Sequence, residues 1–135
     1  MVPRIVLRVL SASVLAVGLA MPAHALDLSG CWAGSWESCT TGHSGVLRAT
    51  FTRCGESQYR VDFSGRFFVI LPFRYSVTLD VVEDTGESVT LAGSSYLGRI
   101  FGTFGYTATA DHCQFRADYT SKKDSGRFVM RRVGS

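Results

Sequence analysis

Three short motifs carry residue types that could perform catalysis or hold a metal ion. In the first, Cys39 and His43 lie four residues apart, so a thiolate and an imidazole could share a metal or activate each other. Two ligands are too few for a stable metal site, and we expect no metal there. In the second, Asp111 and His112 are adjacent but have no nucleophile placed beside them. We expect this pair to cap a turn.

The third motif, the triplet Asp84-Thr85-Gly86, matches the catalytic triplet of aspartic proteases. That chemistry needs two such carboxylates that share one proton. Here the triplet lies in a predicted hairpin turn and precedes Glu87, where that family has a small residue. We therefore expect a tight turn with solvated acidic side chains. Because no complete catalytic set is visible, the sequence predicts a protein that is not an enzyme and uses no cofactor.

Aromatic side chains and one apolar run indicate binding instead of catalysis. Residues 67–73 break the alternation of polar and apolar residues, so some of these side chains must leave the core. The run could form a lid over a ligand pocket, a surface for a protein partner, or a bulged corner folded back on the core. The candidate ligand-binding residues are Trp36, His43, Phe63, Phe68, Tyr75, Tyr96 and Tyr106.

The elements that position these residues are β-strands, because polar and apolar residues alternate with period two. One apolar and one polar face along each run predict an antiparallel sheet with a single buried side. Eight such strands close most economically into an antiparallel up-and-down barrel, which makes the fold all-β; a two-sheet sandwich is the alternative. The predicted strands include residues 30–39, 47–52, 59–64, 73–80, 88–91, 103–107, 114–119 and 127–130.

Residues at the two ends of the chain should meet in such a barrel, because its first and last strands are neighbours. Trp32 and Arg132 should then face inward at the same end, and a guanidinium stacked on the indole would contribute ~1–2 kcal/mol. With Gly30-Cys31-Trp32 at its start and Arg132 at its end, the chain resembles the calycin superfamily of lipocalins, avidins and bacterial relatives. The resemblance implies a small exported barrel in which Gly30, Trp32 and Arg132 (or Arg131) have structural roles.

A barrel of this size can be filled by side chains or can hold one small ligand. Large inward aromatic residues favour a filled interior, whereas glycines such as Gly65 and Gly102 could leave a cavity. The function we expect is binding of a small apolar or aromatic ligand at the open end of the barrel. The alternatives are a protein-binding module, like the calycin-like bacterial metalloprotease inhibitors, and a structural envelope protein.

Four cysteines, an even number in an exported domain, suggest disulfides. If the first hairpin turns near residues 42–43, Cys31 and Cys54 lie opposite each other and both face outward, so we predict a disulfide between them. Cys39 and Cys113 then lie at opposite ends of the barrel. Either a shift in register pairs Cys54 with Cys113, or two thiols stay free.

The first 25 residues have the three parts of a signal peptide: Arg4 and Arg8, an apolar run at 9–21, and the small-x-small site Ala23-His24-Ala25. The apolar run is shorter than the ~20 residues that cross a bilayer, so we expect no transmembrane segment. Residues 26–135 then form one exported domain, periplasmic or extracellular. The alternative is a lipoprotein, since Leu28-Ser29-Gly30-Cys31 matches a lipobox.

The charge of the chain argues against nucleic acid as a partner. Without Arg4 and Arg8, the chain has 12 basic and 11 acidic residues, which leaves it almost neutral. A hydrophobic fraction of 46% also predicts a folded domain with a core.

Overall fold

The computed structural model describes residues 25–67 and 71–134. The predicted signal peptide lies outside this range except for Ala25, and so does Phe68. The elements are β1 (Gly30–Ser38), β2 (Ser44–Gly55), β3 (Gln58–Phe67), β4 (Leu71–Asp84), β5 (Val89–Tyr96), α2 (Gly98–Phe101), β6 (Thr103–Ala110), β7 (Gln114–Thr120) and β8 (Ser125–Gly134). Within the described ranges, no helix has the length and apolar character needed to cross a bilayer.

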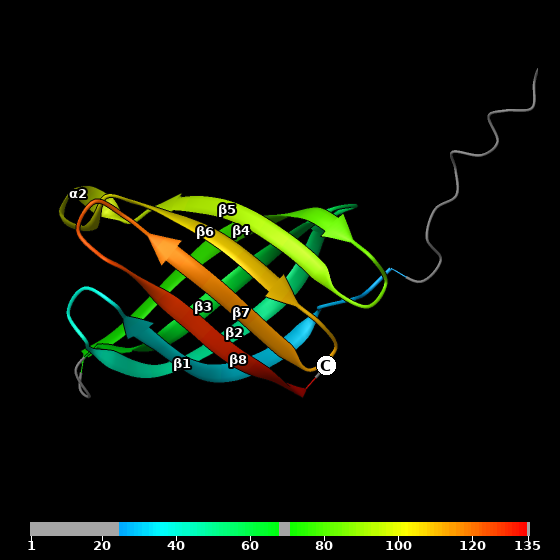
Figure 1. Ribbon diagram of the computed structural model, residues 1–135, viewed down its shortest axis with the longest axis horizontal. Helices are drawn as coiled ribbons and strands as arrows, with labels where there is room; N and C mark the ends of the chain where they lie inside the picture. The colour runs from blue at the N-terminus through cyan, green and yellow to red at the C-terminus, as the bar shows by residue number, and fades with distance from the viewer. Residues whose placement is uncertain (1–24, 68–70, 135) are drawn as a thin grey trace, which may run out of the picture.

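The eight strands form one closed barrel in which every strand pairs with its neighbours in chain order (Figure 1). All the pairs are antiparallel, and β1 closes the barrel against β8, with Trp32 opposite Arg132. The prediction of an all-β, eight-stranded, antiparallel up-and-down barrel is therefore confirmed. Closure removes the two sheet edges that an open sheet of this length would expose to other chains.

The core follows directly from the alternation in the sequence. Inward positions carry large apolar side chains, and outward positions carry polar ones; in β2, for example, Leu47, Ala49 and Phe51 are buried between exposed neighbours. The half of the barrel that contains Trp32 is filled by aromatic rings that meet at its centre. Phe51 lies 5.6 Å from Trp32 and 5.2 Å from Phe115, measured between ring centroids.

One end of the barrel is closed by residues 26–29, which we call the strap. The side chains of Leu26 and Leu28 are 2% and 0% exposed, so the strap is part of the core. The Arg132 guanidinium lies 4.7 Å from the centroid of the Trp32 ring, which is the stacking that the sequence predicted. It also donates hydrogen bonds to the carbonyl oxygens of Ser29, at 2.7 Å, and Asp27, at 2.8 Å.

The register of the first hairpin corrects the predicted disulfide. Cys31 lies opposite Thr50, so Cys54 is four residues further along β2, about 13 Å at the rise of a strand. A disulfide needs Cα atoms less than about 7 Å apart, so Cys31 and Cys54 cannot pair in this fold. The error came from the position of the turn. A hydrogen bond from the Ser38 N–H to the His43 carbonyl closes it, so the turn lies earlier in the chain than the expected centre at residues 42–43. All four cysteines are free and exposed.

Candidate ligand-binding site

A pocket with a volume of about 560 Å³ opens at the end of the barrel opposite the strap. We call this the pocket end; it carries the β1–β2 and β7–β8 turns and α2 (Figure 1). The volume lies within the range of about 300–1,000 Å³ that is usual for sites that hold small molecules. The lining residues are Trp36, Thr41, Phe73, Arg74, Tyr75, Leu97, Ile100, Phe104, Tyr119, Ser121, Lys123, Asp124 and Phe128.

Three of the aromatic rings that line the pocket pack over glycines. Each of these rings stands opposite a glycine on the neighbouring strand, and a side chain at that glycine would collide with it. The pairs are Trp36 with Gly45, Phe73 with Gly65, and Tyr119 with Gly126. A Cβ atom placed at these glycines would lie 2.7 Å from a ring atom and 2.0–2.5 Å from a backbone carbonyl oxygen, closer than real contacts allow. The glycines therefore create the space that the rings occupy.

The floor of the pocket is a stack of aromatic side chains deeper in the barrel. Phe63 is buried and lies 5.2 Å from Tyr75 and 5.3 Å from Phe128, both of which line the pocket. Tyr106 is also buried, 6.1 Å from Phe128, and its hydroxyl lies 3.2 Å from the Ser95 hydroxyl. The floor is therefore apolar, with phenol groups as its polar atoms.

One wall of the pocket is held by hydrogen bonds around Asp124. Its carboxylate accepts a bond of 2.5 Å from the Ser38 hydroxyl and one of 3.1 Å from the Tyr119 hydroxyl. Ser38 is 2% exposed, so the bond satisfies a buried polar group and ties the β1–β2 turn to the β7–β8 turn. Elsewhere in the lining, the indole N–H of Trp36 in β1 donates to the Arg66 carbonyl in β3 at 3.0 Å. These bonds fix the orientation of two rings that line the pocket.

The phenols of the pocket stay protonated well above neutral pH. Burial raises the pKa of Tyr75, with a smaller contribution from the neighbouring Tyr106 hydroxyl. Burial and the charge of Asp124 raise the pKa of Tyr119. The pKa of Tyr106 is raised by burial as well. A ligand in this pocket would therefore meet neutral hydroxyl groups, which can donate or accept a hydrogen bond.

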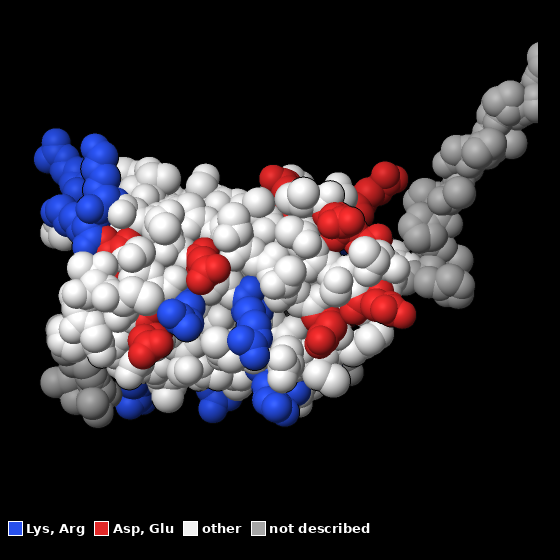
Figure 2. All heavy atoms as spheres, viewed as in Figure 1, with Lys and Arg blue, Asp and Glu red and all other residues white. Residues whose placement is uncertain are grey.

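Charge is distributed unequally between the two ends of the barrel. Figure 2 shows basic side chains gathered at the pocket end and acidic ones at the strap end. The basic residues there include Arg99 in α2 and the adjacent Lys122 and Lys123 in the β7–β8 turn. Arg74 and Lys123 line the pocket itself, and both are exposed. The mouth of an apolar pocket thus carries positive charge.

The structure places the predicted site residues in three groups. Trp36 and Tyr75 line the pocket, and Phe63 and Tyr106 lie in its floor. His43 and Tyr96 do neither, which corrects the prediction. His43 is exposed in the β1–β2 turn, just before β2 starts at Ser44, so the inward alternation of β2 does not extend to it.

Tyr96 is 67% exposed because it is an outward position of β5. The inward positions of that strand are Val89, Leu91 and Ser95, and Tyr96 has the opposite parity. Alternation within β5 could have shown this from the sequence.

Several lining residues were not predicted as ligand-binding. Phe73, Phe104, Tyr119 and Phe128 all have inward parity in the sequence, but they were expected to fill the barrel. What the lining rings of Trp36, Phe73 and Tyr119 have in common is a glycine opposite each of them on the neighbouring strand. That signal needs the strand register, which single-strand alternation does not supply.

The other candidate motifs lie in turns and support them. The Asp111 carboxylate accepts the backbone N–H groups of Cys113 and Gln114, both at 2.8 Å, and so caps the β6–β7 turn. Cys39 lies beside Arg127, with 3.8 Å between its sulfur and the guanidinium. Among the described residues, no three potential metal ligands lie together. A second hollow, of about 380 Å³, lies over the outer face of β6–β8 and is lined mainly by threonines and charged side chains, which suit water.

Comparison with known proteins gives a likeness in fold. No family model and no curated protein matches the chain. The chain is similar to the solved structure of EF1p2_mFAP2b bound to DFHBI, with a TM-score of 0.55 and 12% sequence identity. The match covers 78% of this chain and 92% of that one. The likeness fits a calycin-like barrel at the level of fold.

Proposed function

We propose that the protein is a non-enzymatic barrel that binds one small aromatic or apolar ligand in the pocket between Trp36 and Tyr119. The observation that carries this proposal is the aromatic pocket of about 560 Å³, whose rings are held against the wall by glycines on neighbouring strands. Burying a flat apolar molecule against these rings would release water from both surfaces. The barrel of similar fold holds DFHBI, a small aromatic dye, which supports the proposal at the level of architecture.

The charges at the mouth narrow the chemistry of the ligand. Arg74 and Lys123 line the pocket, and the Asp124 carboxylate in its wall is already bonded to Ser38 and Tyr119, so a ligand with an anionic group at its outer end would gain a charge-assisted contact with the two basic side chains. The neutral phenol of Tyr75 offers a hydrogen bond near the floor without adding a negative charge. We therefore propose an aromatic or apolar body that enters first and an anionic group that stays near the rim.

A pair of fluorescent probes tests this directly. N-phenyl-1-naphthylamine is neutral, and 8-anilinonaphthalene-1-sulfonate adds one anionic group to the same rings. We expect both probes to bind with one-to-one stoichiometry. We expect I100E to weaken both, because Ile100 lines the pocket but is 71% exposed and is not needed for folding. V82E is the matched control, since Val82 is 65% exposed and does not line the pocket.

Adjacent lysines separate the contribution of charge. Lys123 lines the pocket and Lys122 does not, so K123A should weaken the anionic probe roughly twofold to fivefold and leave the neutral probe unchanged. K122A should leave the affinity for the neutral probe unchanged and should weaken the anionic probe less than K123A does. If neither probe binds, or if V82E and I100E have equal effects, the pocket is not the binding site.

A protein partner is the second candidate. Tyr96 and Ile100 are 67% and 71% exposed at the pocket end, and exposed large apolar side chains of this kind often mark protein contacts. Native mass spectrometry of the protein purified from its host distinguishes the two functions. A co-purifying small molecule supports ligand binding, whereas a stoichiometric protein supports the second candidate.

We further propose that the protein is exported and that its leader is removed before Leu26, not before Cys31. Cleavage before Cys31, which lipidation requires, would delete the strap. The Trp32 indole N–H would lose the Leu28 carbonyl that it bonds at 3.0 Å, and Arg132 would lose two of its acceptors. The intact mass of the exported protein tests this, because lipidation would add the mass of acyl chains and remove residues 26–30.

A further inference from the structure

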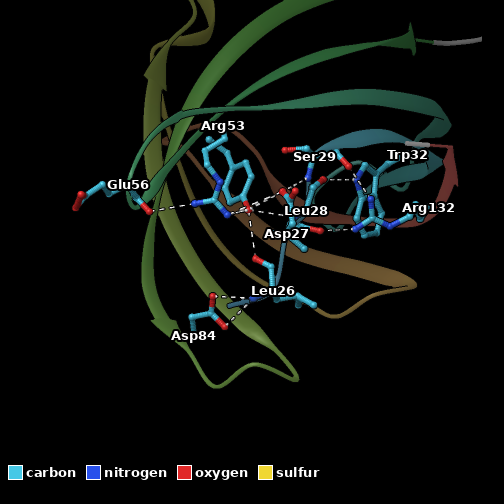
Figure 3. A network of polar contacts seen from close by, with 10 residues as sticks. Leu26, Asp27, Leu28, Ser29, Trp32, Arg53, Glu56, Asp84 and Arg132 are labelled. Atoms are coloured by element: carbon cyan, nitrogen blue, oxygen red, sulfur yellow. Dashed lines mark hydrogen bonds and ion pairs between the residues drawn. The ribbon is translucent and has the colours of Figure 1, made fainter. Parts of the chain in front are cut away.

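The strap places the backbone nitrogen of Leu26 at a fixed point on the strap end (Figure 3). Two anchors hold the strap there. The first is apolar, since the Leu26 and Leu28 side chains are buried. The second is a set of hydrogen bonds: the Leu28 N–H donates to the Tyr59 hydroxyl at 3.0 Å, and Arg132 donates to the carbonyls of Asp27 and Ser29. The Leu26 nitrogen therefore cannot move far without disrupting the core.

That nitrogen faces a carboxylate. It lies 3.2 Å from Asp84 Oδ2 and 3.4 Å from Asp84 Oδ1, so one amide hydrogen is shared between two acceptors at long distances (Figure 3). Asp84 Oδ1 also accepts the Gly86 N–H at 2.8 Å, which fixes the carboxylate within the β4–β5 turn. A neutral amide with one hydrogen uses this geometry poorly, whereas a group with several hydrogens and a positive charge would use both oxygens.

The surroundings of Asp84 favour a cation. Glu83 and Glu87 lie in the same turn, and Figure 2 shows acidic side chains concentrated at this end of the barrel. Among residues 25–67 and 71–134, the ion pairs found do not involve Asp84, Glu83 or Glu87. The turn therefore carries negative charge without a matching basic side chain.

The sequence places a cleavage site at this point. Ala23-His24-Ala25 is the small-x-small pattern that leader peptidases recognise, and the bond after it joins Ala25 to Leu26. Ala25 is exposed and Leu26 is buried, so this bond marks the boundary between surface and core. Of the described residues, a cut here removes only the exposed Ala25.

We propose that Asp84 is a binding site for the α-ammonium group of the mature chain, and that removal of the leader creates the ion pair that locks the strap. A leader endopeptidase adds water across the Ala25–Leu26 amide bond. Ala25 leaves with the new carboxylate, and Leu26 keeps the nitrogen, which takes up a proton to become an ammonium group. That group donates to both Asp84 oxygens, and processing thereby stabilises the closed end of the barrel. The inference rests on the export proposed above but not on ligand binding.

The test compares two chains, one that begins at Leu26 and one that begins at Ala23 and so keeps the last three leader residues. The first is produced from a fusion that a protease removes flush with Leu26. Each is made with Asp84, with D84N and with E87Q, and urea unfolding is measured at neutral pH and low salt. D84N keeps a side-chain oxygen for the Gly86 N–H, so the turn is preserved. E87Q is the matched control, since it removes a charge from the same turn without touching Leu26.

We expect the folding equilibrium constant of the Leu26 chain to exceed that of the Ala23 chain by roughly fivefold to tenfold, the effect of a partly buried charge-assisted contact. With D84N the two chains should have equal folding equilibrium constants, and with E87Q the difference between them should remain. A ratio near one, or the same ratio in D84N, would overturn the proposed site. The intact mass of the protein isolated from its host tests the cleavage separately: a chain that begins at Leu26 supports it, and any other start overturns it.

Discussion

Arg132 is the residue whose loss should most weaken the closed end of the barrel. All three guanidinium nitrogens donate to main-chain carbonyls: Nε to His112 at 2.9 Å, and the other two to Ser29 and Asp27. The same group stacks on Trp32 at 4.7 Å. R132M keeps the aliphatic stem and removes every one of these contacts, so the perturbation is confined to the head group.

The magnitude follows from these contacts. A hydrogen bond from a charged donor contributes about 1.5–3 kcal/mol, and we take about 1 kcal/mol each because Arg132 is half-exposed. Stacking on the indole adds about 1 kcal/mol. R132M should therefore lower the free energy of unfolding by about 3–4 kcal/mol, a large part of the total for a domain of this size.

Urea unfolding measures the loss. With a slope of about 1–3 kcal/mol per molar urea, the midpoint should fall by roughly 1–4 M. R131M is the control, because Arg131 is on the same strand but exposed on the outer face, and its loss should cost less than about 0.5 kcal/mol. R132K, which keeps the charge but not the fork of donors, should fall between them. Equal shifts for R131M and R132M would refute the reasoning.

Three further outcomes are expected. Gly45→Ala should destabilise the barrel by about 2–3 kcal/mol in thermal denaturation and abolish probe binding, because the new Cβ would lie 2.2 Å from the Arg66 carbonyl oxygen; Gly55→Ala meets nothing closer than 3.4 Å and should be tolerated. The free energy of unfolding should fall above pH 10, because phenols ionise near that pH in the unfolded chain while the folded barrel holds the pKa of Tyr75 higher. Y75F should make this fall shallower, as measured by urea midpoints between pH 9 and pH 11. Native protein should titrate four thiols with Ellman's reagent, and peptide mapping should find no bridge between Cys31 and Cys54; a bridge there would show that the first hairpin has a different register.

The sequence was sufficient for the topology because alternation is a local property. Inward and outward positions are read strand by strand, and the meeting of Trp32 with Arg132 follows from closure alone. The register of the first hairpin was not predictable in the same way. It depends on how many residues the turn between Ser38 and Ser44 takes up, and several lengths fit the same composition. The contact of Leu26 with Asp84 joins residues 58 positions apart, and no periodicity in the sequence predicts it.

The two halves of the barrel have the same number of strands, yet one is filled and the other is hollow. In the strap half, Trp32 lies opposite Ala49 and Arg132, and Phe51 lies opposite Val61 and Gly30. The rings of Trp32, Phe51 and Phe115 pack against one another there and close the core. In the pocket half, Trp36, Phe73 and Tyr119 each have a glycine as one cross-strand partner, and a Cβ atom at that glycine would collide with the ring.

Because an eight-stranded barrel is just wide enough for either outcome, the choice rests on a few inward positions. In this barrel, the glycines opposite Trp36, Phe73 and Tyr119 leave room for these rings that a larger residue would take. Gly126 illustrates the point: a Cβ atom there would lie 2.6 Å from the Tyr119 hydroxyl, so any larger residue would drive that ring into the space a ligand needs.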